Sequence, residues 1–111
     1  RDELGPRHRA VPRALNTLVE VHLSRGELEP ALELAQTALE LDLENHGADA
    51  LVTARSRLSL ARVAARGGDQ QRALDEARSA ASTYERLLDP EHPKRLAAEE
   101  LVRGLSGDGA E

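Results

Sequence analysis

Four histidines are the side chains with the clearest potential for metal chemistry: His8, His22, His46 and His92. His8 and His92 occupy equivalent loops before helical segments, and His46 lies in another loop. Zinc needs its ligands about 2.0–2.2 Å from one point, whereas neighbouring helices pack about 8–10 Å apart. Since whole helices separate the equivalent loops, we expect no metal and no cofactor. His22, inside a helical segment, is expected to be a half-buried packing residue.

Candidate acid–base, nucleophilic and phosphate motifs are all weak. Adjacent acidic pairs, such as Asp75-Glu76, do not face each other on a helix. The Gly-rich stretch at 66–69 lacks the Lys-Ser/Thr of a phosphate loop. No serine has a nucleophile-elbow context. The prediction is therefore that this chain is not an enzyme.

Arginines form the most promising constellation. Arg55, Ser59, Arg62 and Arg66 follow the spacing i, i+4, i+7, i+11, which makes one narrow stripe on a helix. Such a stripe binds acidic side chains well, because the guanidinium donors match a carboxylate. The alternative is a solvated face on which Glu20 pairs with Arg62. The residues alone leave both open.

Composition predicts that helices position these residues. The chain has 111 residues, enough for one domain. It has no Phe, Trp, Met, Cys or Ile, and Tyr84 is its only aromatic residue. Leu and Ala, both good helix formers, supply nearly all the apolar volume. The fold class expected is therefore all-α.

Charge and hydropathy exclude two classes of partner. The formal net charge is −5 with both signs interspersed, so no basic patch for nucleic acid is expected. No stretch approaches the roughly 20 apolar residues of a membrane span. The absence of cysteine is compatible with the cytoplasm, which is the location expected.

A period of 42 residues runs through the chain. The matching positions share a residue type and are Leu18 with Leu60, Val21 with Val63, Gly26 with Gly68, Ala31 with Ala73, Leu32 with Leu74, Ala35 with Ala77, and Ala38 with Ala80. A shift of 84 aligns Leu4-Gly5-Pro6-Arg7-His8 with Leu88-Asp89-Pro90-Glu91-His92. One spacing thus relates three parts of the sequence.

Each period is expected to hold two antiparallel helices. Apolar periodicity and the Gly and Pro positions predict five helices in a single domain over 1–111. Their expected ranges are roughly 9–25, 28–45, 48–66, 70–88 and 93–105, followed by a flexible tail at 106–111. The first repeat then covers about 9–46 and the second about 48–89. The third helix is the most apolar, so we expect it to lie between the first and the fifth.

Residues 14–41 resemble a tetratricopeptide repeat. The signature elements are Leu18, Gly26, Ala31 and Ala38. The 42-residue period with its Leu-Gly-Pro-x-His entry resembles the kinesin-light-chain type, which is also widespread in bacteria. Two aromatic positions of the family depart from its pattern. They hold His22 and Ala64 late in the first helix of each repeat, and Ala35 and Ala77 in the second.

The resemblance implies an α-solenoid of about two and a half repeats that binds a protein or peptide. In the family, the first helices of successive repeats line a groove. The corresponding positions are Arg13, Asn16, Glu20 and Ser24 from the first helix, and Arg55, Ser59, Arg62 and Arg66 from the third. The expected function is a scaffold or adaptor, a fragment of a larger bacterial protein whose partner is acidic. The alternative is a sensor or effector domain of a bacterial transcriptional regulator.

The fifth helix begins a repeat whose second helix is absent from this sequence. Its apolar positions are therefore expected to be partly uncovered and to mediate a homodimer. These positions are Leu96, Leu101, Val102 and Leu105.

Overall fold

Five α-helices make up the computed structural model, which describes residues 10–107. They are α1 (Ala10–Ser24), α2 (Leu28–His46), α3 (Leu51–Arg66), α4 (Gln70–Leu87) and α5 (Pro93–Ser106). No strand occurs in the described range, which confirms the all-α fold class. The entry motif with His8, and the tail from residue 108 onward, lie outside the described residues. Of the helices in this range, none is long and apolar enough to span a membrane.

Glycines turn the chain between the paired helices. Gly26 and Gly68 lie one period apart, with φ of 75° and 89°. Residues other than glycine rarely adopt a backbone φ in this left-handed region. Ala31 and Ala73, also one period apart, are both fully buried at the start of the following helix. The period therefore marks equivalent turn positions and equivalent buried positions in the two repeats.

The start of α3 differs from the prediction. The helix begins at Leu51, three residues after the expected start at 48. Gly47 has φ 87° and ψ 174°, which takes the chain out of the helical region. Residues 48–50 then form a turn, and the Thr53 hydroxyl donates to the Gly47 carbonyl at 2.7 Å. Residues 48–50 therefore reverse the chain direction and do not extend the helix.

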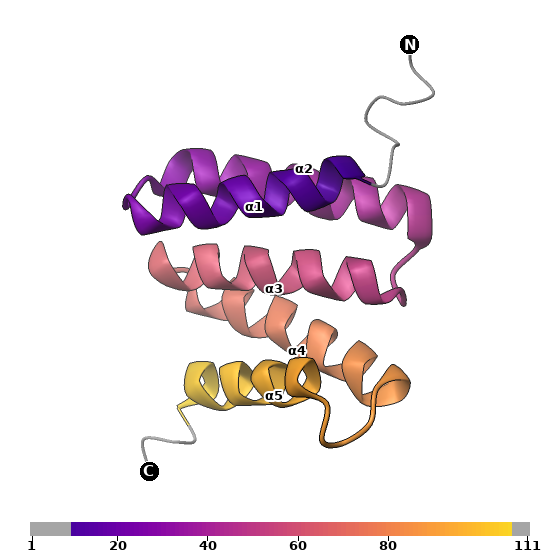
Figure 1. Cartoon of the computed structure of the whole chain (residues 1–111). Helices are drawn as coiled ribbons and strands as arrows, with labels where there is room; N and C mark the ends of the chain where they lie inside the picture. The colour runs from indigo at the N-terminus through magenta and orange to yellow at the C-terminus, as the bar shows by residue number, and fades with distance from the viewer. Residues whose placement is uncertain (1–9, 108–111) are drawn as a thin grey trace.

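The helices stack in sequence order, each packed on the next (Figure 1). Short connections make neighbouring helices antiparallel. The helix α3 lies in the middle, as expected, and packs against α2 and α4. Ala54 and Leu58 of α3 share an apolar cluster with Ala98 of α5.

Two apolar clusters hold the stack together. The first joins α1, α2 and α3 through residues that include Val19, Ala35, Leu60 and Val63. Leu60 and Val19 are fully buried, and complete burial of such a side chain contributes about 1.5–3 kcal/mol. The second cluster joins α3, α4 and α5 around Tyr84, which is 2% exposed. Tyr84 is therefore a core residue.

A buried polar triad also links α1, α2 and α3. The Asn16 side-chain amide donates to Ser56 Oγ at 2.9 Å, and Ser56 Oγ donates to Asp42 Oδ2 at 2.6 Å. All three residues are less than 5% exposed. Buried polar groups need such partners, because an unsatisfied one costs about 1–3 kcal/mol. The triad holds three helices through directional contacts.

Candidate peptide-binding surface

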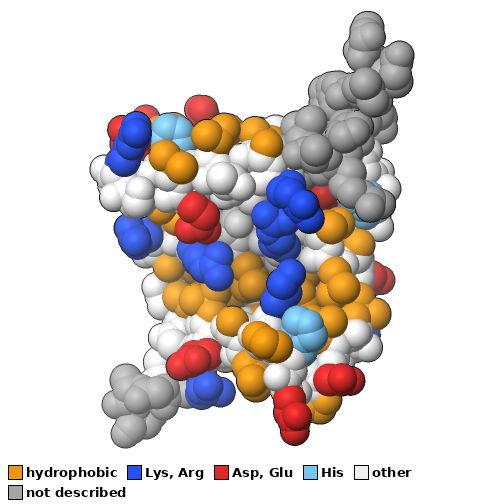
Figure 2. Space-filling view, viewed as in Figure 1, with side chains coloured by type: hydrophobic (Ala, Val, Ile, Leu, Met, Phe, Trp, Pro, Cys, Tyr) orange, Lys and Arg blue, Asp and Glu red, His pale blue; other side chains and the backbone are white. Residues whose placement is uncertain are grey.

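The helices α1, α3 and α5 form one face of the molecule, turned toward the reader in Figure 1. Figure 2 shows this face with side chains coloured by type. A column of Lys and Arg side chains crosses its middle beside an apolar patch. Basic and apolar groups therefore lie next to each other on the face that the repeat pattern assigned to binding.

A hollow of about 210 Å³ lies where α1, α3 and α5 begin, and we name it the N-end pocket. Both apolar and basic side chains line it. The lining residues are Arg13, Leu51, Val52, Arg55, Tyr84, Leu88, His92 and Lys94. Arg13 and Arg55 lie one period apart in the sequence, so equivalent positions of two repeats meet in one pocket.

The cationic groups of the N-end pocket are not neutralised within the described range 10–107. No ion pair or hydrogen bond joins the side-chain nitrogens of Arg13, Arg55 or Lys94 to another residue of that range. The N-termini of α3 and α5 add partial positive charge at the same place. Ala50, at the start of α3, has no side chain to accept from the first-turn N–H groups. The pocket is thus suited to an anionic group.

Tyr84 brings a phenol to this pocket. Burial raises the pKa of Tyr84 above its ordinary value of 10.0, and the positive charges of Arg55 and Arg62 partly oppose that rise. The phenol therefore stays protonated at neutral pH.

A second hollow, of about 410 Å³, lies near the ends of α1 and α3, and we name it the C-end pocket. Its cations are engaged. Arg62 lies 3.6 Å from Glu20 in an ion pair whose side chains are 47% and 56% exposed. Arg66 donates to the Leu23 carbonyl at 3.4 Å, near the end of α1. The pairing of Glu20 with Arg62, which the sequence left open as an alternative, is present in the structure.

Two of the predicted groove residues are not on the surface. Asn16 and Ser59 are each only 4% exposed. Asn16 belongs to the buried triad, where its amide bonds Ser56. The assignment of these two side chains to the groove is therefore wrong. Both are short polar side chains that the structure buries between helices.

Two residues of the N-end pocket were missed by the sequence analysis as binding residues. His92 caps α5, where its Nδ1 accepts from the backbone N–H of Lys94 at 3.1 Å. Lys94 lies in the first turn of that helix. No repeat signal marks Lys94, since Val52 occupies the equivalent position one period earlier. Only the packing of α5 on α4 brings it beside Arg55.

The described histidines do not form a metal centre. Within residues 10–107, no three or more His, Cys, Asp or Glu side chains are grouped so that they could hold a metal ion. His22 is partly buried, and its Nδ1–H donates to Glu27 Oε1 at 2.6 Å. The half-buried position predicted for His22 is confirmed, and the contact that holds its ring is polar.

Comparison with protein families identifies the chain. A family model described as tetratricopeptide repeat matches residues 11–86. The chain belongs to the tetratricopeptide repeat family. Tetratricopeptide repeats generally mediate protein–protein interaction and are non-catalytic. A search of the curated proteins found no match.

The apolar positions of the final helix of this tetratricopeptide repeat domain are partly uncovered, as its pattern predicted. Leu101 and Val102 pack against the cluster around Tyr84 and are partly buried. Leu105 is also partly buried. Leu96 alone of the four predicted positions is exposed, at 49%.

Proposed function

We propose that the domain binds an acidic segment of a partner protein across the face of α1, α3 and α5. The observation that carries this proposal is the convergence on one pocket of three cations, Arg13, Arg55 and Lys94, whose side chains pair with no residue of the range 10–107. Each comes from a different helix. A carboxylate placed there meets guanidinium donors and two helix N-termini at once.

The apolar residues that line the N-end pocket support the same proposal. Leu51 is 41% exposed, and Leu88 is partly buried beside it. An apolar side chain next to the acidic one would cover this surface and remove water from around the charges. Electrostatic attraction is stronger where water is excluded. The preferred segment therefore alternates acidic and apolar residues.

Long-range charge does not assist this binding. The chain carries a formal charge of −5, so an acidic ligand is repelled at a distance. Attraction must come from the local field of the N-end pocket. Exposed charges are screened over about 8 Å at physiological ionic strength, so binding should weaken as salt rises.

The test is fluorescence anisotropy with a labelled peptide of alternating Glu and Leu, compared with its Gln and Leu counterpart. We expect Arg55→Ala and Lys94→Ala each to weaken the Glu peptide about tenfold, because hydrogen bonds to charged groups contribute about 1.5–3 kcal/mol. Arg78→Ala is the matched control, since Arg78 is an exposed cation of α4 that does not line the N-end pocket.

Two results would overturn the proposal. One is equal affinity for the Glu and Gln peptides at low salt. The other is binding that survives the combined Arg13→Ala, Arg55→Ala and Lys94→Ala variant. In the second case the interface lies elsewhere on the domain.

Three finer assignments accompany this proposal. The 42-residue period supports the kinesin-light-chain type of repeat and a scaffold or adaptor role. The exposure of Leu96 supports self-association through α5. Sedimentation tests the latter, with a loss of dimer expected for Leu96→Glu. A wild-type chain that stays monomeric at high concentration would contradict self-association through α5.

A further inference from the structure

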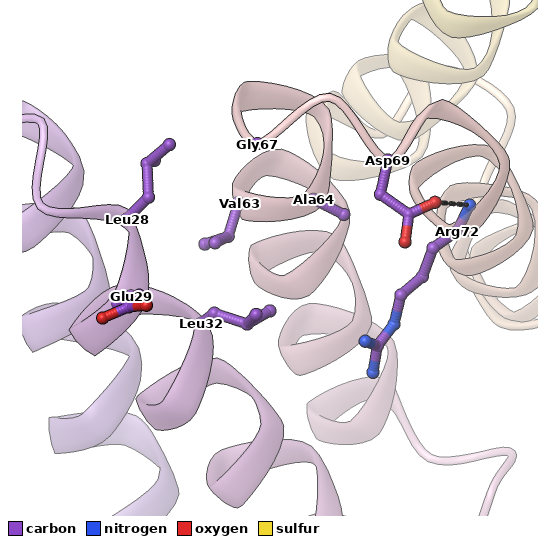
Figure 3. A pocket seen from close by; sticks show the side chains of 8 residues that line it. All are labelled: Leu28, Glu29, Leu32, Val63, Ala64, Gly67, Asp69 and Arg72. Carbon is purple, nitrogen blue, oxygen red and sulfur yellow. Dashed lines mark hydrogen bonds between the residues drawn. The ribbon is translucent and has the colours of Figure 1, made fainter.

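A third hollow, of about 150 Å³, lies between α2, α3 and α4, and we name it the Ala64 hollow (Figure 3). Leu28 and Leu32 of α2 form one wall, and Val63 and Ala64 of α3 form another. Figure 3 shows the Leu32 and Val63 side chains reaching toward each other from neighbouring helices. A cavity of roughly 150 Å³ is large enough to hold a benzene-sized ring.

The repeat period shows what is missing from this hollow. Ala64 lies one period after His22, and Asp69 lies one period after Glu27. In the first repeat the His22 ring bonds Glu27 at 2.6 Å. In the second repeat the carboxylate is kept but the ring is replaced by a methyl group. A ring held by Asp69 as His22 is held by Glu27 would lie in the Ala64 hollow.

The charges at the rim favour a ring with an N–H donor. Asp69 Oδ1 accepts from the backbone N–H of Arg72 at 3.2 Å, which leaves its second oxygen available. Glu29 is an exposed carboxylate on the opposite rim. The Arg72 guanidinium is turned to Gln36, whose amide oxygen, in the orientation that satisfies both groups, lies 3.0 and 3.1 Å from its terminal nitrogens. Two carboxylates therefore line the hollow, while the Arg72 guanidinium that also lines it is engaged by Gln36.

This chain offers no free ring from its described part. Tyr84 is 2% exposed. His22 is bonded to Glu27, His92 caps α5, and His46 is partly buried. A ring in this hollow would therefore come from outside the described residues.

We propose that the Ala64 hollow binds a histidine side chain of a protein partner, in the place that His22 fills within the first repeat. The imidazole ring packs against Leu28, Leu32 and Val63, and its N–H donates to Asp69. This site goes beyond the proposed acidic-segment binding, since position 64 lies about 13 Å along the helix axis from Arg55. The two surfaces can be occupied at the same time by one partner.

The experiment is an NMR titration of the full chain with N-acetyl-histidine methylamide, alongside the phenylalanine and alanine analogues. We expect saturable shifts at the methyl groups of Leu28, Leu32 and Val63, with the order histidine, phenylalanine, alanine. Ala64→His, which supplies the ring from within the chain, should abolish these shifts. Ala65→His is the matched control, because Ala65 lines the C-end pocket instead, and it should bind as the wild type does.

Asp69→Asn separates ring packing from the carboxylate contact and keeps the helix cap, since Asn caps as well as Asp. We expect it to weaken histidine binding about tenfold and to leave phenylalanine binding unchanged. It also serves as the test if Ala64→His does not fold.

Three outcomes would overturn the proposal: no saturable shift, shifts that survive Ala64→His, or equal affinity for histidine and phenylalanine in the wild type. Arg55→Ala should not affect this titration, so failure here is distinct from failure of the acidic-segment proposal.

Discussion

The first half of the stack, α1 to α3, and the second half, α3 to α5, have polar and apolar residues respectively at three equivalent positions. The three residues of the polar triad in the first half lie one period before three residues of the apolar cluster in the second. The equivalent pairs are Asn16 with Leu58, Asp42 with Tyr84, and Ser56 with Ala98. All six side chains are less than 10% exposed. One backbone plan therefore accommodates either a hydrogen-bonded junction or an apolar one.

The polar triad and the apolar cluster contribute differently to the fold. The contacts from Asn16 to Ser56 and from Ser56 to Asp42 depend on direction, so they specify how α1, α2 and α3 meet. Tyr84 and Leu58 bury more apolar area and depend little on direction. We infer that the apolar junction contributes more to the free energy of unfolding, while the polar junction determines helix placement.

The largest effect is expected from Tyr84→Ala. Truncation of a buried aromatic side chain typically lowers the free energy of unfolding by about 3–5 kcal/mol, because it removes apolar contacts and leaves a cavity. Denaturant unfolding followed by circular dichroism measures the loss. A loss below about 1 kcal/mol would mean that the second half does not depend on its aromatic centre.

A smaller effect is expected from Asp42→Ala. The change leaves the Ser56 hydroxyl without its acceptor in a buried place, which costs about 1–3 kcal/mol. Asp42→Asn is the control, because an amide oxygen still accepts from Ser56. If the two variants unfold at the same denaturant concentration, the hydrogen bond is not what stabilises this junction.

Exchange of one junction for the other tests the comparison directly. The combined variant Asn16→Leu, Asp42→Tyr, Ser56→Ala gives the first half the residues of the second. We expect the free energy of unfolding to stay within about 1 kcal/mol of wild type or to rise, because buried polar networks are often replaced by apolar residues without loss. A variant less stable than Asp42→Ala would show that the two halves are not interchangeable.

Alkaline pH should weaken the apolar junction. The pKa of Tyr84 is raised by burial, with Arg55 and Arg62 opposing. A raised folded pKa means that its contribution is fully present below the unfolded value, about 10, and is lost as pH rises through the folded value. Tyr84 is the only aromatic residue, so tyrosinate absorbance reports it alone. Tyr84→Phe should remove this part of the pH dependence.

The smallest effect is expected from Arg62→Ala. The ion pair with Glu20 is about half exposed, and such pairs contribute about 0–1 kcal/mol. The stability loss of Arg62→Ala thus gives the value for an exposed polar contact, with which the loss of Asp42→Ala in the buried polar triad is compared. An Arg62→Ala loss as large as that of Asp42→Ala, measured by the same denaturant method, would erase the distinction between buried and exposed polar contacts.

Much of the fold could be predicted from the sequence. The helices from 28 and 70 begin where expected, and both glycine turns adopt positive φ. These features depend on local chemistry: apolar spacing, and the freedom of glycine. The start of α3 was missed because the reversal after Gly47 consumes residues in a way that periodicity does not reveal.

The candidate site could be predicted only in part. Arg55 was found from the arginine stripe, and Arg13 from the groove positions that the family resemblance implies. Asn16 lies three residues from Arg13, about 60° round the helix axis, which turns it into the junction between helices. Lys94 and His92 join the pocket although no period connects them to Arg55.

The sequence by itself determined the helices, their turns, the repeat period and the small residues where helices approach closely. Those properties follow from rotamer freedom, φ preference and apolar spacing within one segment. The tertiary structure decided which polar groups are free. Glu20 reaches Arg62 and the Leu23 carbonyl reaches Arg66 only because α1 and α3 pack together, while Arg13, Arg55 and Lys94 meet no acceptor in the described chain. Whether a charge is neutralised depends on which neighbour lies within a few ångströms, and that distance is set by how the helices stack.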